Sequence, residues 1–408
     1  MSTGSKGIAR PTIEIENTGE RHTIDGVELE FVYVLDTEAP VEIMVWIPQL
    51  KAFCTAEDMT HNMHNLQTLR GAKVRNGLLW SKAVDTAIER YGNQVEVSFS
   101  THHWPTWGNE RIVDYWEAQR DMYRYLHDQT LHLANRGLTP DEIAEEMKLP
   151  ASLSSQFNCR GYYGTLSHNV KAQYDLYFGW FNGNPAHLNP LPPSELGAKY
   201  VEAIGGADKV LEVAKASYAK GEYRWVATLL DNLVFAEPDN MEARQLLADT
   251  YTQLGYQAES GPWRNFYLTG ARDLFKKDVP YTSQLINDGV LAQMDMGTLL
   301  DYCAIQLNGE KAAGKKAVIN INFTDTKEKV MLMLNNGVLN HRLDSQDEKA
   351  DLTLEIEKMN FVKLFFGRTD LQTLLKTDKV KTTGNTQAMD VICSAYEPAD
   401  PNFKIVLP

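Results

Sequence analysis

Hydrophobic and polar residues alternate with a period of two over much of residues 11–102, the pattern of half-buried β-strands. We expect strands at residues 13–15, 29–35, 41–47, 50–55 and 95–100. The alternation breaks from Asn76 to Tyr91, where apolar residues recur at helical spacing up to Gly92, a typical helix stop. Strands joined by a crossover helix predict an α/β layered structure.

Residues 109–275 follow a helical pattern instead. A long amphipathic run covers residues 115–134, and Thr139-Pro140-Asp141-Glu142 has the form of a capping box with proline at the first helical position. The proline-rich residues 185–193 predict a rigid connection. This part of the chain is therefore expected to be all-α.

A faint internal repeat lies in residues 214–255. Tyr218 and Gly221 recur as Tyr251 and Gly255 after roughly 34 residues, the tetratricopeptide period. Fewer than three units do not form a free-standing solenoid. We expect these helices to pack against another part of the protein, such as a second subunit.

The last segment, residues 280–408, returns to alternating strands followed by short helices. We expect strands at residues 318–323, 330–334, 337–341 and 351–356, and helices at residues 361–366 and 371–376. A half-buried sheet under apolar helices can enclose an apolar ligand, but the same pattern builds any α+β core. At 408 residues, the chain is too long for one core. We divide it into residues 1–109, 110–279 and 280–408.

Composition and charge narrow the classes of partner. The formal net charge of −14 opposes nucleic acid or an anionic membrane surface as partner. No apolar run is long enough to span a membrane, and no apolar leader opens the chain, so the sequence as given is expected in the cytoplasm. The cysteines are scattered without a C-x-x-C motif, which gives no sign of a disulfide framework or a thiolate zinc site.

Candidate chemistry lies where predicted strands end. Glu38, Glu57 and His102 each follow a strand, and ligands bind outside the carboxyl ends of strands in open α/β sheets. Carboxylates and imidazole suit Zn, Mn or Fe, and a carboxylate can bridge two metals. From spacing alone, these residues are more often solvated turn groups.

Residues 56–72 are read as a turn followed by a helix. His61 and His64 would share one helical face there, and we interpret both as helix-surface or packing residues. Arg70 with Asn65 suggests a binding site for a tetrahedral oxyanion, because a guanidinium binds such groups bidentately. A helical salt bridge is the ordinary alternative for Arg70.

The Gly-bracketed segment Arg160 to Asn169 lies within the helical region. Glycine beside Arg160, Tyr162 and His168 is typical of a pocket wall, and equally of a loop buried at an interface. Both readings stay open.

Several of these segments together resemble the later part of the alkyl sulfatases, a branch of the metallo-β-lactamase superfamily. The matching pieces are Thr37-Glu38-Ala39-Pro40, Ala56-Glu57-Asp58, His64-Asn65-Leu66, Thr68 to Ala72, Ser100 to Gly108, Gln119 to Thr130, Arg160 to Asn169 and Gly179 to Pro185. The resemblance covers the chain from about residue 2 onward.

The resemblance implies a two-zinc site and a substrate. Glu38 would bind one zinc, His102 the other, and Glu57 would bridge both, while Asn65 and Arg70 would hold the sulfate group. The implied reaction is hydrolysis of a linear alkyl sulfate, such as dodecyl sulfate, to alcohol and sulfate.

The resemblance also assigns the architecture. Residues 1–109 would be the C-terminal portion of a metallo-β-lactamase-like αββα catalytic domain. Residues 110–279 would be a helical, tetratricopeptide-like homodimerisation domain. Residues 280–408 are similar to a sterol-carrier-protein-type-2 domain that would handle the alkyl chain.

One family motif, H-x-H-x-D-H, which supplies four metal ligands, does not occur in this sequence. We expect it upstream of Met1, with a secretion signal that would make the full-length protein periplasmic or secreted. The chain alone is then an incomplete fragment, with little zinc affinity and no turnover. The alternative is a non-catalytic, dimeric protein that binds apolar ligands without metal.

Overall fold

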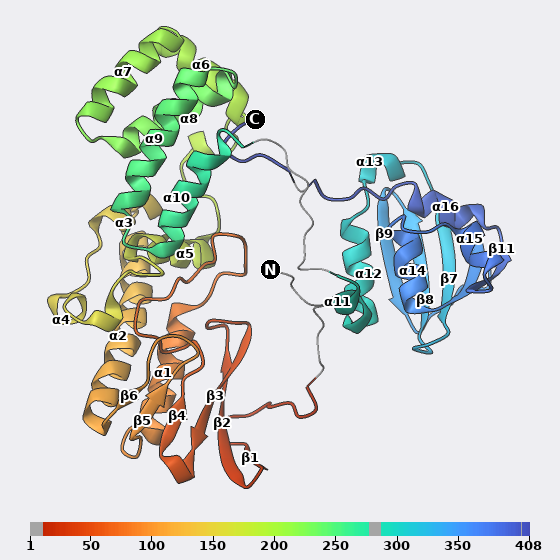
Figure 1. Ribbon diagram of the computed structural model, residues 1–408, viewed down its shortest axis with the longest axis horizontal. Helices are drawn as coiled ribbons and strands as arrows, with labels where there is room; N and C mark the ends of the chain where they lie inside the picture. Colours follow the sequence, from red (N-terminus) through yellow and green to blue (C-terminus); the bar gives the residue numbers. More distant parts are fainter. Residues whose placement is uncertain (1–10, 277–286, 401) are drawn as a thin grey trace. The chain divides into compact units, whose positions relative to one another are not determined.

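The computed structural model describes residues 11–276, 287–400 and 402–408 (Figure 1). They form two compact units, one built from residues 13–276 with 404–408, the other from residues 11–12, 287–400 and 402–403. The predicted border between residues 279 and 280 falls outside the described residues. All four cysteines are free thiols.

A six-stranded sheet in the order β1-β2-β3-β4-β5-β6 forms the first part of the larger unit. Its strands are β1 (Arg21–Ile24), β2 (Val27–Leu35), β3 (Val41–Ile47), β4 (Ala52–Cys54), β5 (Val97–Phe99) and β6 (Thr106–Trp107). β4 and β5 pair in parallel across the crossover helix α1 (Gly77–Tyr91), and the other neighbours are antiparallel. β2, β4 and β5 therefore run in the same direction, and their carboxyl ends share one edge of the sheet.

Helices α1 and α2 (Asn109–Ala134) pack side by side against this sheet (Figure 1). The Asn76 side chain caps α1 by accepting from the Leu78 and Leu79 amides, and Gly92 ends the helix. Trp80 and Val84 of α1 and Trp116 of α2 are fully buried between the layers. The predicted crossover helix and α/β layering are confirmed.

The rest of this unit is helical, as predicted. Its helices are α3 (Pro140–Glu146), α4 (Ala151–Ser154), α5 (Leu166–Phe178), α6 (Pro193–Ile204), α7 (Ala207–Ala219), α8 (Tyr223–Ala236), α9 (Met241–Gln257) and α10 (Gly261–Asp273), with 3-10 turns η1 (Pro48–Leu50), η2 (Phe157–Cys159) and η3 (Pro185–His187). The capping box at Thr139 is present. α6 to α9 enclose a core of their own around Val226, Leu230 and Leu247.

The smaller unit is α+β, with a five-stranded sheet in the order β11-β10-β7-β8-β9. Its strands are β7 (Ala317–Phe323), β8 (Lys329–Asn335), β9 (Val338–Leu343), β10 (Leu352–Ile356) and β11 (Val380–Gly384). Its helices are α11 (Asp288–Gln293), α12 (Met296–Ile305), α13 (Gly309–Ala312), α14 (Lys358–Phe365), α15 (Leu371–Lys376) and α16 (Gln387–Cys393). β10 pairs in parallel with β7, and Phe361 and Phe365 of α14 are fully buried.

Two local predictions were wrong. Residues 13–15 form no strand, and residues 56–72 contain no helix. Residues 56–72 are irregular yet largely buried. This is possible because side chains from the surrounding helices form hydrogen bonds with their backbone groups. Trp80 Nε1 donates to the Asp58 carbonyl (2.7 Å), and the Tyr123 hydroxyl accepts from the His64 amide (3.1 Å).

Candidate active site

The carboxyl ends of β2, β4 and β5 bring predicted metal ligands to one edge of the sheet. Glu57, after β4, and His102, after β5, are in direct contact, with His102 Nε2 2.9 Å from Glu57 Oε1. Glu38 follows β2 at the same edge and offers a carboxylate oxygen to the same cluster. Strand direction therefore brings Glu57 into contact with His102, while Glu38 groups with Glu57 and His64.

Glu57 is held by groups on three sides. Its backbone amide donates to Glu42 Oε1 (3.0 Å), and its two carboxylate oxygens face His64 and His102. Hydrogen bonding to His64 and then His102 outweighs partial burial and lowers the pKa of Glu57 to about 2. This carboxylate is therefore charged throughout the physiological range.

His64 lies in this cluster, and of the two interpretations given for it, helix surface or packing, the helix surface was wrong. Its side chain is 6% exposed, and its Nε2 lies 3.6 Å from Glu57 Oε2. One ligand atom each from Glu38, Glu57 and His64 lies within 4.8 Å of the other two. The error arose because His64 lies in an irregular buried segment, where helical spacing carries no information.

His61, in contrast, is a packing residue. Its ring stacks on Tyr115 (4.6 Å between centroids) and on Trp104 (5.2 Å). Its Nε2 lies 3.1 Å from both the Trp104 carbonyl and the Thr106 hydroxyl. Burial lowers the pKa of His61, which favours the neutral ring.

Arg75 connects several residues of the site, and the sequence did not predict this role. Its guanidinium forms an ion pair with the Glu38 carboxylate and donates to the Glu38 carbonyl (2.5 Å). It also donates to Asn65 Oδ1 (2.6 Å) and lies 3.1 Å from His64 Nδ1. Arg75 thus ties the loop after β2 to the segment after β4. Only its closeness in sequence to Arg70 hinted at this.

The two predicted sulfate ligands differ in surroundings. Asn65 is 3% exposed, with its side-chain oxygen held by Arg75. Arg70 is exposed, in a turn that the Gly71 amide closes by donating to the Thr68 carbonyl (3.0 Å).

Helix α5 fixes the segment that carries His64 and Asn65. Asn169 is fully buried; its amide nitrogen donates to the His64 carbonyl (2.9 Å) and its oxygen accepts from the Leu66 amide (2.8 Å). Gln173, one turn further, bonds the Arg75 carbonyl (2.9 Å) and the Gly77 amide (3.0 Å). One face of α5 therefore sets the backbone on both sides of the cluster.

The glycine-bracketed segment before α5 packs directly on the site backbone. A Cβ at Gly164 would lie 2.5 Å from the His64 carbonyl oxygen, so only glycine fits there. Tyr163 contacts the His64 ring, with 4.8 Å between centroids. Arg160 pairs with Glu259 (2.5 Å), and Tyr162 is 38% exposed beside the Arg160 guanidinium.

A cavity of about 280 Å³ opens beside the cluster. Its lining residues are Thr60, Asn62, His64, His102, His103 and Tyr163. His103 has a positive φ of 69° and its Nε2 lies 3.3 Å from the Asn62 amide nitrogen. The cavity lining thus combines hydroxyl, amide and imidazole groups with the aromatic ring of Tyr163.

Two further carboxylates lie beneath the cluster. Burial raises the pKa of Glu42 to about 7, and the charges of Glu38 and Glu57 add to this effect. Burial, with the charge of Glu42, also raises the pKa of Asp58 well above its usual range. The sequence analysis named Asp58 only within the segment Ala56-Glu57-Asp58 and did not single out Glu42, because nothing in the strand pattern marks Glu42 as inward-facing.

The raised pKa of Glu42 predicts a specific pH dependence. Because its pKa is raised from 4.5 to about 7, the stability it contributes is present below pH 4.5 and is lost as pH rises through 7. Glu42→Gln keeps an acceptor for the Glu57 amide and removes the titration. In metal-free buffer, urea unfolding should show that the variant loses about 2–3 kcal/mol less than the parent between pH 5 and pH 8. Equal losses in parent and variant would contradict this assignment.

No helix within the described residues has the length and apolar character needed to cross a membrane.

Comparison with known proteins identifies two family models within the chain. The model described as alkyl sulfatase dimerisation matches residues 139–277, and the model described as alkyl sulfatase C-terminal matches residues 284–408. The first match covers the helices from α3 to α10, and the second covers the α+β unit.

Curated relatives and solved structures match along most or all of the chain. A linear primary-alkylsulfatase from Pseudomonas sp. is 45% identical over 100% of this chain and 60% of its own length. A linear primary-alkylsulfatase from Pseudomonas sp. (strain ATCC 19151) is 31% identical over 93% of this chain and 73% of its own length. The stereoselective inverting sec-alkylsulfatase Pisa1 from Pseudomonas sp. superposes with a TM-score of 0.96 at 40% identity, over 100% of this chain and 64% of that chain.

The chain thus spans about 60% of the length of the first of these relatives. The relatives match this chain in sequence, and Pisa1 matches it in fold, over 93% or more of its length. The chain belongs to the alkylsulfatase family.

Proposed function

We propose that this chain is the larger part of a zinc-dependent alkylsulfatase that hydrolyses linear alkyl sulfates of the dodecyl sulfate type to alcohol and sulfate. The observation that carries the proposal is the placement of Glu57, with His102 on one carboxylate oxygen and His64 on the other, beside Glu38. The alkylsulfatase names of the relatives give the reaction class.

The donor set fits a zinc site. Glu38, Glu57 and His102 offer hard oxygen and imidazole donors, and Glu57 presents two oxygens, as a bridging ligand requires. Glu42 and Asp58 lie next to this donor set, and burial raises the pKa of both carboxyls, which favours their neutral forms. Bound zinc would lower the pKa of a water ligand towards neutrality and polarise the sulfate ester.

The chain's own residues would orient the substrate. Asn65 and the exposed Arg70 would grip the sulfate group, since an amide and a guanidinium are strong donors to tetrahedral oxyanions. Arg75 would hold Glu38 and Asn65 in position from the protein side. Tyr163 would shield the polar cavity from bulk water on its aromatic side.

Sulfate release from dodecyl sulfate tests this function. The chain should be assayed alone and fused to a segment that carries the H-x-H-x-D-H motif. We expect release only from the fusion, and we expect a chelator or Glu57→Ala to abolish it. Chelator-sensitive release by the chain alone would disprove our expectation that it is an inactive fragment. Release from the fusion that survives both treatments would disprove the zinc site.

We also propose that the protein is a homodimer. The dimerisation family model covers residues 139–277, and large apolar side chains between α5 and α6 are exposed. Trp180 is 73% exposed, Leu188 58% and Leu191 47%. Such a group of exposed apolar residues is typical of a protein interface.

Trp180→Glu should convert a dimer into a monomer without unfolding it, because the side chain is exposed and the new charge opposes association. Light scattering after size exclusion measures the mass. The control is Ile305→Glu, at an equally exposed position (75%) outside the dimerisation match, and it should remain dimeric. A monomeric parent would refute the proposed dimer, and a dimeric Trp180→Glu would refute its placement at Trp180.

For the α+β unit we keep the proposal of a sterol-carrier-protein-type-2-like domain. Its support is a five-stranded sheet whose apolar face is buried by α14 and α16.

A further inference from the structure

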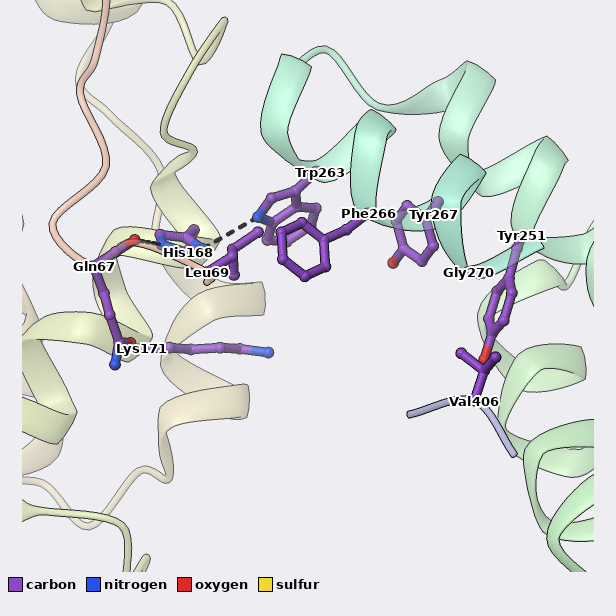
Figure 2. A pocket seen from close by; sticks show the side chains of 10 residues that line it. All are labelled: Gln67, Leu69, His168, Lys171, Tyr251, Trp263, Phe266, Tyr267, Gly270 and Val406. Carbon is purple, nitrogen blue, oxygen red and sulfur yellow. Dashed lines mark hydrogen bonds between the residues drawn. The ribbon is translucent and has the colours of Figure 1, made fainter. Parts of the chain in front are cut away.

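A second and larger cavity, of about 460 Å³, lies in the helical part of the larger unit (Figure 2). It is lined by Gln67, Leu69, His168, Lys171, Tyr251, Trp263, Phe266, Tyr267, Gly270 and Val406. Its volume lies within the range of about 300–1,000 Å³ that small-molecule sites occupy. We call it the α10 pocket.

The walls of the α10 pocket are mostly apolar. Trp263, Phe266 and Tyr267 project from one face of α10, and Leu69 approaches from the segment after β4 (Figure 2). Phe266 is 50% exposed and Leu69 39% exposed, so apolar surface remains open to a ligand. An unbranched alkyl chain has the shape and chemistry to cover such surface.

One cationic group borders these apolar walls. Lys171 extends from α5 towards the open space (Figure 2), and its ammonium lies 2.6 Å from Asp141 Oδ1. Its side chain is 45% exposed, so the ammonium remains accessible to a second anion. An apolar pocket with an ammonium at its border favours an amphiphile with a negatively charged head group over an uncharged apolar molecule.

A hydrogen-bonded chain joins the α10 pocket to the segment that carries the candidate active site. Trp263 Nε1 donates to His168 Nδ1 (3.2 Å), which leaves His168 Nε2 to donate to the Gln67 carbonyl (2.7 Å). Gln67 lies only two residues after Asn65. Gln67 of the pocket wall and Asn65 of the proposed sulfate-binding site therefore lie in one short segment.

We propose that the α10 pocket binds the alkyl chain of an anionic amphiphile, with Lys171 attracting the head group. The choice of an alkyl chain as ligand rests on the proposed function, whereas the binding itself needs neither metal nor active-site chemistry. The helical part then carries an alkyl-binding site of its own, separate from residues 280–408.

Calorimetric titration of the full chain in the presence of a chelator tests the proposal. The probes are octyl, nonyl and decyl sulfonate below their micelle concentrations, because a sulfonate is not hydrolysed. We expect saturable binding to one site, about fourfold tighter for each added methylene. Affinity that does not change with chain length would overturn the proposal.

Variants then locate the bound ligand. Phe266→Glu should weaken decyl sulfonate binding at least tenfold, whereas Phe275→Glu, at a similarly exposed position (41%) outside the pocket lining, should not. Lys171→Gln should weaken decyl sulfonate several-fold and leave decanol unchanged. Its control is Lys215→Gln, which breaks a comparable surface pair with Glu242 (2.5 Å) away from the pocket.

Equal binding by parent, Phe266→Glu and Lys171→Gln would overturn the assignment to this pocket. A Phe266→Glu variant whose mass changes from dimer to monomer would also overturn it, because a second copy would then cover the pocket. Since all titrations are done without metal, loss of sulfate release in the fusion would count against the proposed function alone.

Discussion

Arg75→Ala should destabilise the chain by about 2–4 kcal/mol in metal-free buffer. The Arg75 side chain is 12% exposed and its Glu38 partner 20%, so removing the guanidinium leaves a mostly buried carboxylate without its cation. Asn65 also loses the donor to its side-chain oxygen. Urea unfolding followed by circular dichroism measures the change.

Arg70→Ala is the matched control, because it removes an exposed arginine from the same segment. Its effect on stability should stay within about 0.5 kcal/mol, as for most surface substitutions. Arg75→Lys separates charge from geometry. An ammonium keeps the ion pair with Glu38 but cannot reach Asn65 in the same forked arrangement, so an intermediate loss is expected. Equal stability of Arg75→Ala and Arg70→Ala would show that the contacts of Arg75 with Glu38 and Asn65 do not stabilise the site.

Asn169→Leu should have an effect of similar size, about 2–5 kcal/mol. The substitution leaves the His64 carbonyl and the Leu66 amide buried without partners, and each unsatisfied group costs about 1–3 kcal/mol. The segment with His64 and Asn65 would also lose its anchor on α5. Thermal and urea unfolding measure the stability, and amide exchange at Leu66 reports the local opening.

Gln245→Leu is the control for a lost side-chain amide. Gln245 is exposed on α9 and bonds only the Asp249 carboxylate (3.0 Å) among the hydrogen bonds described, so little change is expected. If Asn169→Leu were as mild as Gln245→Leu, α5 would not be what holds the site segment in place.

The sequence predicted most of the regular elements, because strand alternation and helix caps are local signals. The capping box at Thr139 and the strands β2 and β3 lie where the pattern placed them, although Met44 and Trp46, and not Val41 and Ile43, form the buried face of β3. Convergence of Glu57 and His102 also followed from strand direction.

The irregular segment after β4 could not be predicted in the same way. Its conformation is set by partners remote in sequence, such as Tyr123 and Asn169, whose bonds replace backbone pairing. The roles of His64 and Arg75 depend on that conformation. Residue spacing therefore placed His64 in the wrong environment and predicted no environment for Arg75.

We propose that Glu38, Glu57 and His102 form one half of a two-zinc site. The most direct measurement is the zinc content and zinc affinity of the chain fused to a segment carrying H-x-H-x-D-H. We expect two zinc ions per fused chain, loss of tight binding in Glu57→Ala, and little zinc on the unfused chain. Two tightly bound zinc ions in the Glu57→Ala fusion would contradict this proposal.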